Sequence, residues 1–263
     1  IYEAGKFYLK QQGKPTGIPV SDVIQTAIQS MGLNDVAPFD PHEKILGLPE
    51  NPKNALVELK TCDFVHEVSR DTPAPGGGSI AALAGSLGAA LASMVSTLTI
   101  GKKGYEKVES DLLNLAEKAQ EIKDKLLKAV DDDTNAFNAY LEATRLPQST
   151  PEEKARRQEA IQEGLKQAVK VPLTTAQLSM EALRLCEEAV EKGNVNSVTD
   201  AGVGAQIAYT GVLGGVFNVL INLGQITDTD FVEEMRNTCA ELETSGKELL
   251  ERTLNRVKEK MKK

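Results

Sequence analysis

The stretch that decides the fold, residues 71–94, reads DTPAPGGGSIAALAGSLGAALASM. Three consecutive glycines, Gly76, Gly77 and Gly78, precede a run of small and aliphatic residues without a single charge. Such a run beside a helical pattern indicates a phosphate-binding loop, a membrane helix or very close packing between helices. The rest of the chain has to decide among these three interpretations.

A nucleotide loop and a membrane helix both fit poorly. The glycine triplet matches neither GxxxxGK[ST] nor GxGxxG, and no βαβ pattern surrounds it. Residues 72–101 and 201–227 carry no charge, and each window is long enough to cross a bilayer. Both windows contain Ser, Thr and Gly throughout, and neither has flanking basic clusters. We therefore expect buried helices of a bundle and no transmembrane helix.

Close helix packing is the remaining interpretation. We predict a helix over residues 79–100, with Ser79 as its cap. Its small side chains recur at steps of three and four residues, at Ala82, Gly85, Gly88, Ala89, Ala92, Ser93 and Ser96. A predicted helix that starts at Ala201 has the same character, so the two helices pack closely on each other or across a dimer interface.

The composition favours an all-α protein. Hydrophobic residues make up 41% of the 263 residues, but aromatic residues only 4%, and Trp is absent, which is typical of helix bundles. The net charge of −8 argues against nucleic acid and anionic membranes as partners. Cys62, Cys186 and Cys239 lack CxxC spacing, so we expect buried, inert thiols. With no signal peptide after Ile1, we expect a cytoplasmic piece of a longer protein.

The chain divides into three segments. Residues 1–48 begin with two predicted short helices, the first ending at Gly13 and the second beginning at Ser21. Prolines then interrupt the helical pattern around a predicted linker, residues 49–58. Residues 59–263 read as a continuous helical domain.

Further helices are predicted within and around this domain. Residues 56–70 indicate a short amphipathic helix, and a last helix runs from Asp228 to the C-terminus. A long helix starts after a cap at Ser149 or Thr150, and Pro172 predicts a kink or a break within it.

The most informative polar residue is Asp133. Steps of four and three residues from Val108 to Ala143 give a seam that is apolar at every position except Asp133. A carboxylate on a buried face is costly unless it is paired, hydrogen-bonded or protonated. Periodicity alone leaves two explanations open: a helix stutter or structural ion pair, or a functional carboxylate. The neighbouring Asp131 and Asp132 leave the seam and are expected to face solvent.

Other polar residues carry weaker signals. His42 and His66 lack the partner spacing of a zinc site, so we expect no metal. Lys102 and Lys103 follow the first uncharged helix, where they either compensate the helix dipole or bind an anion. Asp200 opens the second uncharged helix.

Ordered motifs over residues 59–263 resemble the formimidoyltransferase-cyclodeaminase family, within the wider cyclodeaminase and cyclohydrolase group. The matching stretches read FVHEVSRDTPAPGGGSIAALAGSLGAALASMV, DDDTNAFNAYLEATRLP, STPEEKARRQEAIQEGLKQAVKVPL, TDAGVGAQIA and FNVLINL. Residues 1–48 resemble the end of the transferase domain of that family. The transferase's catalytic histidine lies in a part that this chain lacks, so the resemblance implies no transferase activity.

The resemblance implies an all-α, cytoplasmic enzyme that needs no metal or cofactor. Its reaction converts 5-formimino-tetrahydrofolate to 5,10-methenyl-tetrahydrofolate and ammonia. Aligned on Phe137, the family's catalytic acid falls on Asp133, the residue that breaks the apolar seam. Asp200 matches a Ser-Asp motif of the family, although Thr199 replaces the serine.

The resemblance also implies substrate contacts. The glycines at 76–78 and Ser79 become a wall of backbone against which a flat pterin lies, because glycine has no Cβ. Lys102 and Lys103 become partners for the carboxylates of a polyglutamate tail.

The resemblance implies a homo-oligomer, at least a dimer. Two other functions remain open. A methenyl-tetrahydrofolate cyclohydrolase would use water in place of the ammonia chemistry, and a non-catalytic bundle would serve only to oligomerise the transferase.

Overall fold

The computed structural model describes residues 1–35, 37–48 and 55–262, and within these ranges the chain forms helices and loops but no β-strand. The α-helices are α1 (Tyr2–Gln11), α2 (Val20–Ser30), α3 (Pro41–Lys44), α4 (Thr61–Val68), α5 (Gly77–Thr99), α6 (Glu109–Thr144), α7 (Pro151–Lys192), α8 (Val198–Asn222) and α9 (Thr229–Met261). Short 3-10 helices are η1 (Leu56–Glu58), η2 (Glu106–Val108), η3 (Val195–Ser197) and η4 (Leu223–Gln225).

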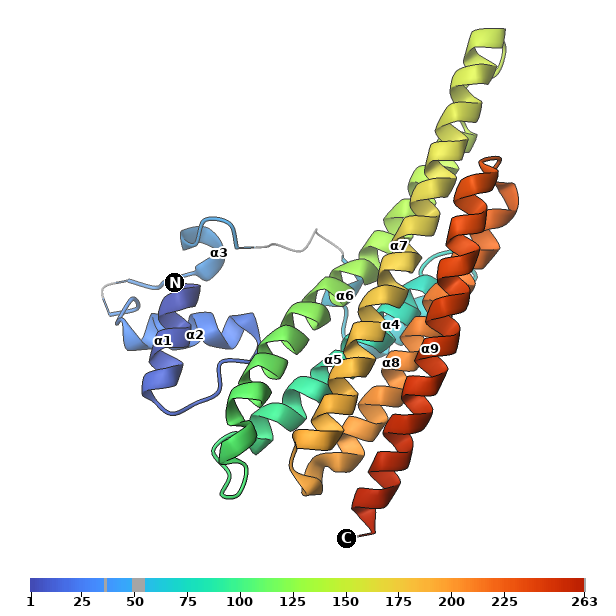
Figure 1. Ribbon diagram of the computed structural model, residues 1–263. Helices are drawn as coiled ribbons and strands as arrows, with labels where there is room; N and C mark the ends of the chain where they lie inside the picture. The colour runs from blue at the N-terminus through green and yellow to red at the C-terminus, as the bar shows by residue number, and fades with distance from the viewer. Residues whose placement is uncertain (36, 49–54, 263) are drawn as a thin grey trace.

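The long helices α5 to α9 form one elongated bundle, with α1 to α3 at its side (Figure 1). Helix α5 packs against α6, α7 and α8, while α9 packs against α7 and α8. The end of α6 and the start of α7 project beyond the other helices as a two-helix arm (Figure 1). The predicted all-α bundle is confirmed.

Glycines allow α5 and α8 to approach with their backbones in close contact. A Cβ atom on Gly88 would lie 2.9 Å from the carbonyl oxygen of Gly204. One on Gly211 would lie 2.9 Å from the carbonyl oxygen of Ala81. Real Cβ atoms do not come this close to backbone oxygens, so these positions require glycine. The expectation that the two uncharged helices pack on each other is confirmed.

The start of α5 differs from the prediction. Gly76 occupies the N-cap position and supplies no side-chain cap. Ser79 is fully buried inside the first turn, and its Oγ donates to the carbonyl oxygen of Val130 in α6 at 2.7 Å. The prediction of Ser79 as the cap is wrong because a bond to a neighbouring helix, invisible in local sequence, takes its hydroxyl.

Helix α7 begins with the capping box of Thr150 and Glu153 and continues through Pro172 without a break. Proline lacks the N–H that would bond to the carbonyl of Ala168, four residues earlier. The side-chain Nδ2 of Asn222 in α8 donates to that carbonyl at 2.8 Å. The expected break is therefore absent, because α8 supplies the donor that Pro172 removes.

The segment before α5 is less helical than predicted. The helix expected over residues 56–70 is divided into η1 and α4, with Lys60 in an extended conformation between them. The backbone N–H of Leu56 donates to the carboxylate of Asp131 at 2.7 Å, so Asp131 anchors this segment instead of facing solvent. Of the predicted linker, residues 49–54 lie outside the described residues.

A carboxylate of α6 helps to hold the N-terminal segment against the bundle. Glu117 pairs with Lys6 at 3.0 Å and accepts a hydrogen bond from Thr16. Helix α1 ends before Gly13, whose φ of 65° favours glycine, and α2 begins at Val20, one residue before the predicted start. These contacts place residues 1–35 against the bundle.

The three cysteines are not all buried. Cys186 and Cys239 are buried, and burial raises the pKa of the Cys186 thiol to about 12. Cys62 at the start of α4 is exposed, so the expectation of a buried thiol is wrong there. The amphipathic pattern of this short helix did not fix which face its neighbours cover.

Two helices are long and apolar enough to cross a membrane by length and composition. One is α5, whose apolar window is 67% buried in the bundle. The other comprises residues 195–225, around α8, and its window is only 39% buried. The centre of the bundle accounts for the apolar character of α5, whereas α8 keeps an apolar face at the surface.

Candidate active site

Asp133 lies where α6 passes the N-terminus of α5. The backbone N–H of Ser79, in the first turn of α5, donates to its carboxylate. Asp133 thereby binds one of the N–H groups that a helix N-terminus leaves without an intrahelical partner. The partial positive charge at this end of the helix favours the ionised carboxylate.

Burial acts on Asp133 in the opposite direction and is the larger effect. Removal of water from the half-buried carboxylate raises its pKa above the usual range for Asp, against the lowering effect of the Ser79 hydrogen bond. A carboxyl group with a raised pKa both takes and returns protons closer to neutral pH. The side chain is therefore suited to general acid and base chemistry.

The three glycines have different surroundings. A Cβ on Gly78 would overlap the carboxylate of Asp133, so only glycine leaves room for that group. A Cβ on Gly77 would lie 3.4 Å from the side chain of Asn218 in α8. A Cβ on Gly76 would meet only the carbonyl oxygen of Pro73 at 3.6 Å, an ordinary contact. The first turn of α5 is thus approached by α6 on one side and by α8 on another.

The remaining predicted site residues lie elsewhere. Lys102 and Lys103 are exposed in the loop after α5, and Asp200 lies in the first turn of α8, which adjoins the end of α5. Asp133 contacts the opposite end of α5, which has 23 residues. At a rise of 1.5 Å per residue, this helix is about 33 Å long. Within one chain, these three residues do not share a site with Asp133.

Sequence reasoning missed Asn218. It lies in the quoted stretch FNVLINL, and the signal was an amide in the second half of an otherwise largely apolar helix. The sequence alone did not indicate that this amide reaches the start of α5.

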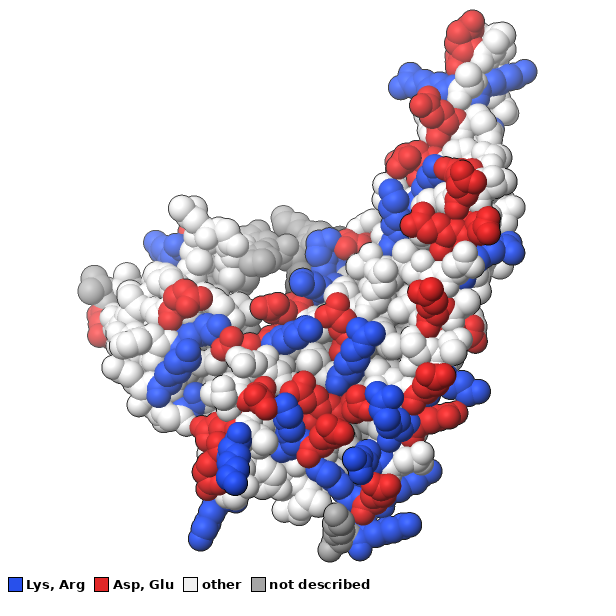
Figure 2. Space-filling view, in the orientation of Figure 1, with Lys and Arg blue, Asp and Glu red and all other residues white. Residues whose placement is uncertain are grey.

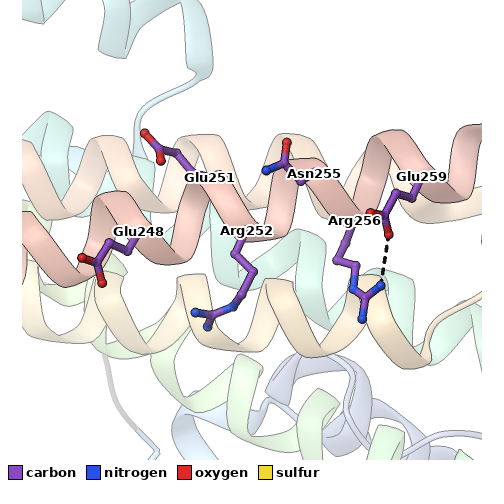
Figure 3. Close-up of a pocket in the computed structure, with 6 residues that line it drawn as sticks. All are labelled: Glu248, Glu251, Arg252, Asn255, Arg256 and Glu259. Carbon is purple, nitrogen blue, oxygen red and sulfur yellow. Dashed lines mark hydrogen bonds and ion pairs between the residues drawn. The ribbon is translucent and has the colours of Figure 1, made fainter.

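A surface hollow along α9 is unrelated to Asp133. It measures about 490 Å³ and follows the exposed side of α9, where Arg252, Arg256 and Glu259 are among the lining residues (Figure 3). Arg256 pairs there with Glu259, and Arg252 pairs with Glu187 of α7. This hollow lies toward the end of α7, the far end of the bundle from Asp133.

The charge distribution offers no strong attraction for nucleic acid on the visible face. Acidic and basic side chains alternate over this face of the bundle (Figure 2). Across the described part of the chain, no three His, Cys, Asp or Glu side chains come together as a metal site would require.

The fold and the site together define a class of protein. Proteins of this class are all-α bundles in which a closely packed, glycine-rich helix, here α5, has a desolvated carboxylate from a neighbouring helix at its N-terminus. Residues 60–241 match the family described as formiminotransferase-cyclodeaminase, and residues 1–48 match the formiminotransferase domain. The chain belongs to the formiminotransferase-cyclodeaminase family, which confirms the resemblance drawn from the sequence motifs.

Similar proteins include enzymes named for each of the two activities of the wider group, cyclodeaminase and cyclohydrolase. Formimidoyltransferase-cyclodeaminase of Mus musculus is 40% identical over 245 residues, which cover 92% of this chain and 45% of the mouse protein. The chain thus spans less than half the length of that relative. Methenyltetrahydrofolate cyclohydrolase of Methylorubrum extorquens is 41% identical over 198 residues, which cover 75% of this chain and 95% of that protein.

A solved structure supports the fold. The crystal structure of formiminotetrahydrofolate cyclodeaminase from Thermotoga maritima superposes with a TM-score of 0.65 at 29% identity. The match covers 79% of this chain and 98% of that one.

Proposed function

We propose that this chain expels ammonia from 5-formimino-tetrahydrofolate and forms 5,10-methenyl-tetrahydrofolate. The observation that carries the proposal is the Asp133 carboxylate, which is desolvated and held against Gly78 at the start of α5. The family of the chain, and the activities for which its relatives and the Thermotoga maritima protein are named, support this substrate class.

The reaction needs one group that accepts and returns a proton. Nitrogen 10 of the folate attacks the carbon of the protonated formimino group, an amidinium, which gives a tetrahedral carbon bonded to nitrogen 5, to the still protonated nitrogen 10 and to an amino group. Asp133 takes the proton from nitrogen 10 and delivers it to the amino group, which then leaves as ammonia. The carbon–nitrogen bond to ammonia breaks as the cationic methenyl bridge forms, and the nearby carboxylate stabilises that positive charge.

Two copies of the chain form the working unit in this proposal. An apolar face of α5 and α8 is exposed in the single chain, and its exposed residues are Leu87, Met94, Leu98, Val203, Phe217, Leu220 and Ile221. Exposed apolar surface of this extent is typical of an interface between proteins. Antiparallel pairing of two copies through this face brings the partner's Lys102 and Lys103 toward Asp133, where they bind the carboxylates of a polyglutamate tail.

Other parts of the proposal follow from the same family. The reaction needs no metal or organic cofactor besides the folate substrate, and the enzyme works in the cytoplasm. We do not expect transferase activity from this chain.

A cyclohydrolase is the second candidate, favoured by the relative from Methylorubrum extorquens, almost all of which this chain matches. The residues 1–48 that match the formiminotransferase domain favour the deaminase instead. A bundle that only oligomerises a transferase would not need a desolvated carboxylate at a helix N-terminus.

One experiment separates these functions. The purified chain is given 5-formimino-tetrahydrofolate, and both the absorbance of the methenyl product and the released ammonia are followed. The proposal predicts equal amounts of the two products. Hydrolysis of added methenyl-tetrahydrofolate that is faster than this conversion would assign the cyclohydrolase, and no turnover of either compound would leave only the oligomerising role.

A further inference from the structure

Asn218 is an amide of α8 that the packing of the bundle does not require. Its neighbour one turn later, Asn222, supplies the hydrogen bond that Pro172 removes from α7. The Nδ2 of Asn218 donates only to the carbonyl oxygen of Gly214 in its own helix, at 2.7 Å. In a regular helix this carbonyl, four residues earlier, already accepts the backbone N–H of residue 218. The fold therefore explains Asn222 but not Asn218.

The position of Asn218 links it to the candidate active site. Its Nδ2 and Oδ1 would lie 3.4 Å and 3.9 Å from a Cβ on Gly77. The carboxylate of Asp133 lies against the next residue, Gly78. Consecutive residues of an α-helix project about 100° apart around its axis. The amide from α8 and the carboxylate from α6 consequently flank the same first turn of α5.

The hydrogen bond to Gly214 fixes which end of the amide is free. A carbonyl oxygen accepts only from the NH₂ end, so Nδ2 points toward the backbone of α8. Among the described residues, no donor is bonded to the Oδ1 of this half-buried side chain. Asn218 thus presents a neutral hydrogen-bond acceptor beside the start of α5.

We propose that the Oδ1 of Asn218 accepts a hydrogen bond from the formimino N–H of the substrate, opposite Asp133. This inference rests on the proposed deaminase function. The protonated formimino group is an amidinium with two N–H donors on the nitrogen that leaves as ammonia, so the contact is a hydrogen bond to a charged group. An acceptor on the second side of that nitrogen orients it toward Asp133 for protonation.

A neutral acceptor suits this position better than a second carboxylate. A second negative charge near Asp133 would raise the pKa of Asp133 further and oppose ionisation of the base. The amide orients the leaving nitrogen without this effect.

The experiment compares Asn218→Ala with Asn222→Ala, a matched control in the same helix. Loss of one hydrogen bond to a charged group predicts a fall in kcat/KM of about 10- to 100-fold for Asn218→Ala, with an unchanged melting temperature. Asn222→Ala leaves a carbonyl without a donor, so it lowers the melting temperature but keeps kcat/KM. The reverse pattern would overturn the inference.

Product binding separates a substrate contact from a structural role. The methenyl bridge has no N–H group, so Asn218→Ala should bind 5,10-methenyl-tetrahydrofolate as tightly as the unchanged chain does. If Asn218→Ala weakens the binding of substrate and product equally, Asn218 only maintains the shape of the site and does not contact the formimino group. The isosteric Asn218→Asp keeps the acceptor but should move the acid limb of the pH–rate profile to higher pH.

Binding in an inactive background separates this inference from the proposed function. Equilibrium affinity for 5-formimino-tetrahydrofolate is measured in Asp133→Asn with and without Asn218→Ala. We expect about 10-fold weaker binding in the double variant. Equal affinities would reject the role of Asn218 even if the deaminase activity itself stands. If the unchanged chain binds the folate but does not turn it over, the proposed deaminase function is rejected. The affinity comparison in the Asp133→Asn background would still test the contact between Asn218 and the substrate.

Discussion

Replacement of Gly78 by alanine tests the geometry of the site. The new methyl group would occupy the space of the Asp133 carboxylate, which must then turn away from α5. Alanine in a helix gains about 0.5 to 1 kcal/mol over glycine. Loss of the hydrogen bond from the Ser79 N–H to a charged group costs about 1.5 to 3 kcal/mol. Release of the carboxylate from burial offsets this loss, because desolvation outweighs the Ser79 hydrogen bond in raising the pKa of Asp133. The net expectation is a change of less than about 1 kcal/mol in the free energy of unfolding.

The effect of Gly78→Ala on turnover should be much larger than its effect on stability. Displacement of a catalytic group by about 1 Å lowers the rate about 100-fold. Steady-state formation of the methenyl product measures the rate, and urea unfolding measures the stability of the same preparation. The matched control is Gly76→Ala, where a methyl group makes only an ordinary contact with Pro73.

Gly76→Ala should lose up to about 1 kcal/mol of stability, because glycine is the better N-cap, and its kcat should fall far less than that of Gly78→Ala. Wild-type kcat in Gly78→Ala would refute the argument that the glycine makes room for a working carboxylate. An equal loss of kcat in both variants would also contradict it, since the helix start and not Asp133 would then be responsible.

Three further predictions concern the bundle. Gly211→Ala should lower the free energy of unfolding by about 1 to 3 kcal/mol, because the methyl group overpacks the contact between α5 and α8; urea unfolding measures it. The buried Ser179 Oγ has no hydrogen-bond partner among the described residues, so Ser179→Ala should be neutral or raise the melting temperature. Burial opposes ionisation of Glu117, but hydrogen bonds from Thr16 and Lys6 outweigh it and lower its pKa. This stabilisation is present above the usual pKa of Glu and disappears as the pH falls through the lowered value, so acid should expose residues 1–48 to limited proteolysis; Glu117→Gln should remove that pH dependence.

The broken seam predicted that Asp133 lies on a buried face of α6, and the structure places its carboxylate half-buried against α5. Hydrophobic periodicity can do this because it reports which face of a helix is buried. The same periodicity could not say what lies opposite. The partner of Asp133 is a backbone N–H of α5, and no side-chain pattern encodes it. Ser79 shows the same limit, since a cap and a bond to a neighbouring helix require the same residue type.

The second limit is that separation along the sequence does not report distance in the folded chain. Lys102 and Lys103 follow α5 closely in sequence, yet the length of that helix carries them to the far end of the bundle. Asn218 is far from Asp133 in sequence, yet the antiparallel course of α8 returns it to the start of α5. Pro172 was expected to interrupt α7, but Asn222 on another helix compensates for it, and compensation of this kind depends on tertiary packing.

The central claim, that Asp133 is the acid and base of the reaction, is tested most directly by the turnover of Asp133→Asn. The raised pKa of Asp133 means that ionisation lowers stability as the pH rises from the usual pKa of Asp to the raised value. Asparagine keeps the acceptor for the Ser79 N–H without that charge, so the variant should be at least as stable at neutral pH. We predict a loss of turnover of about 100-fold or more in a protein with an unchanged or higher melting temperature. Turnover within a few-fold of the unchanged chain would contradict the account.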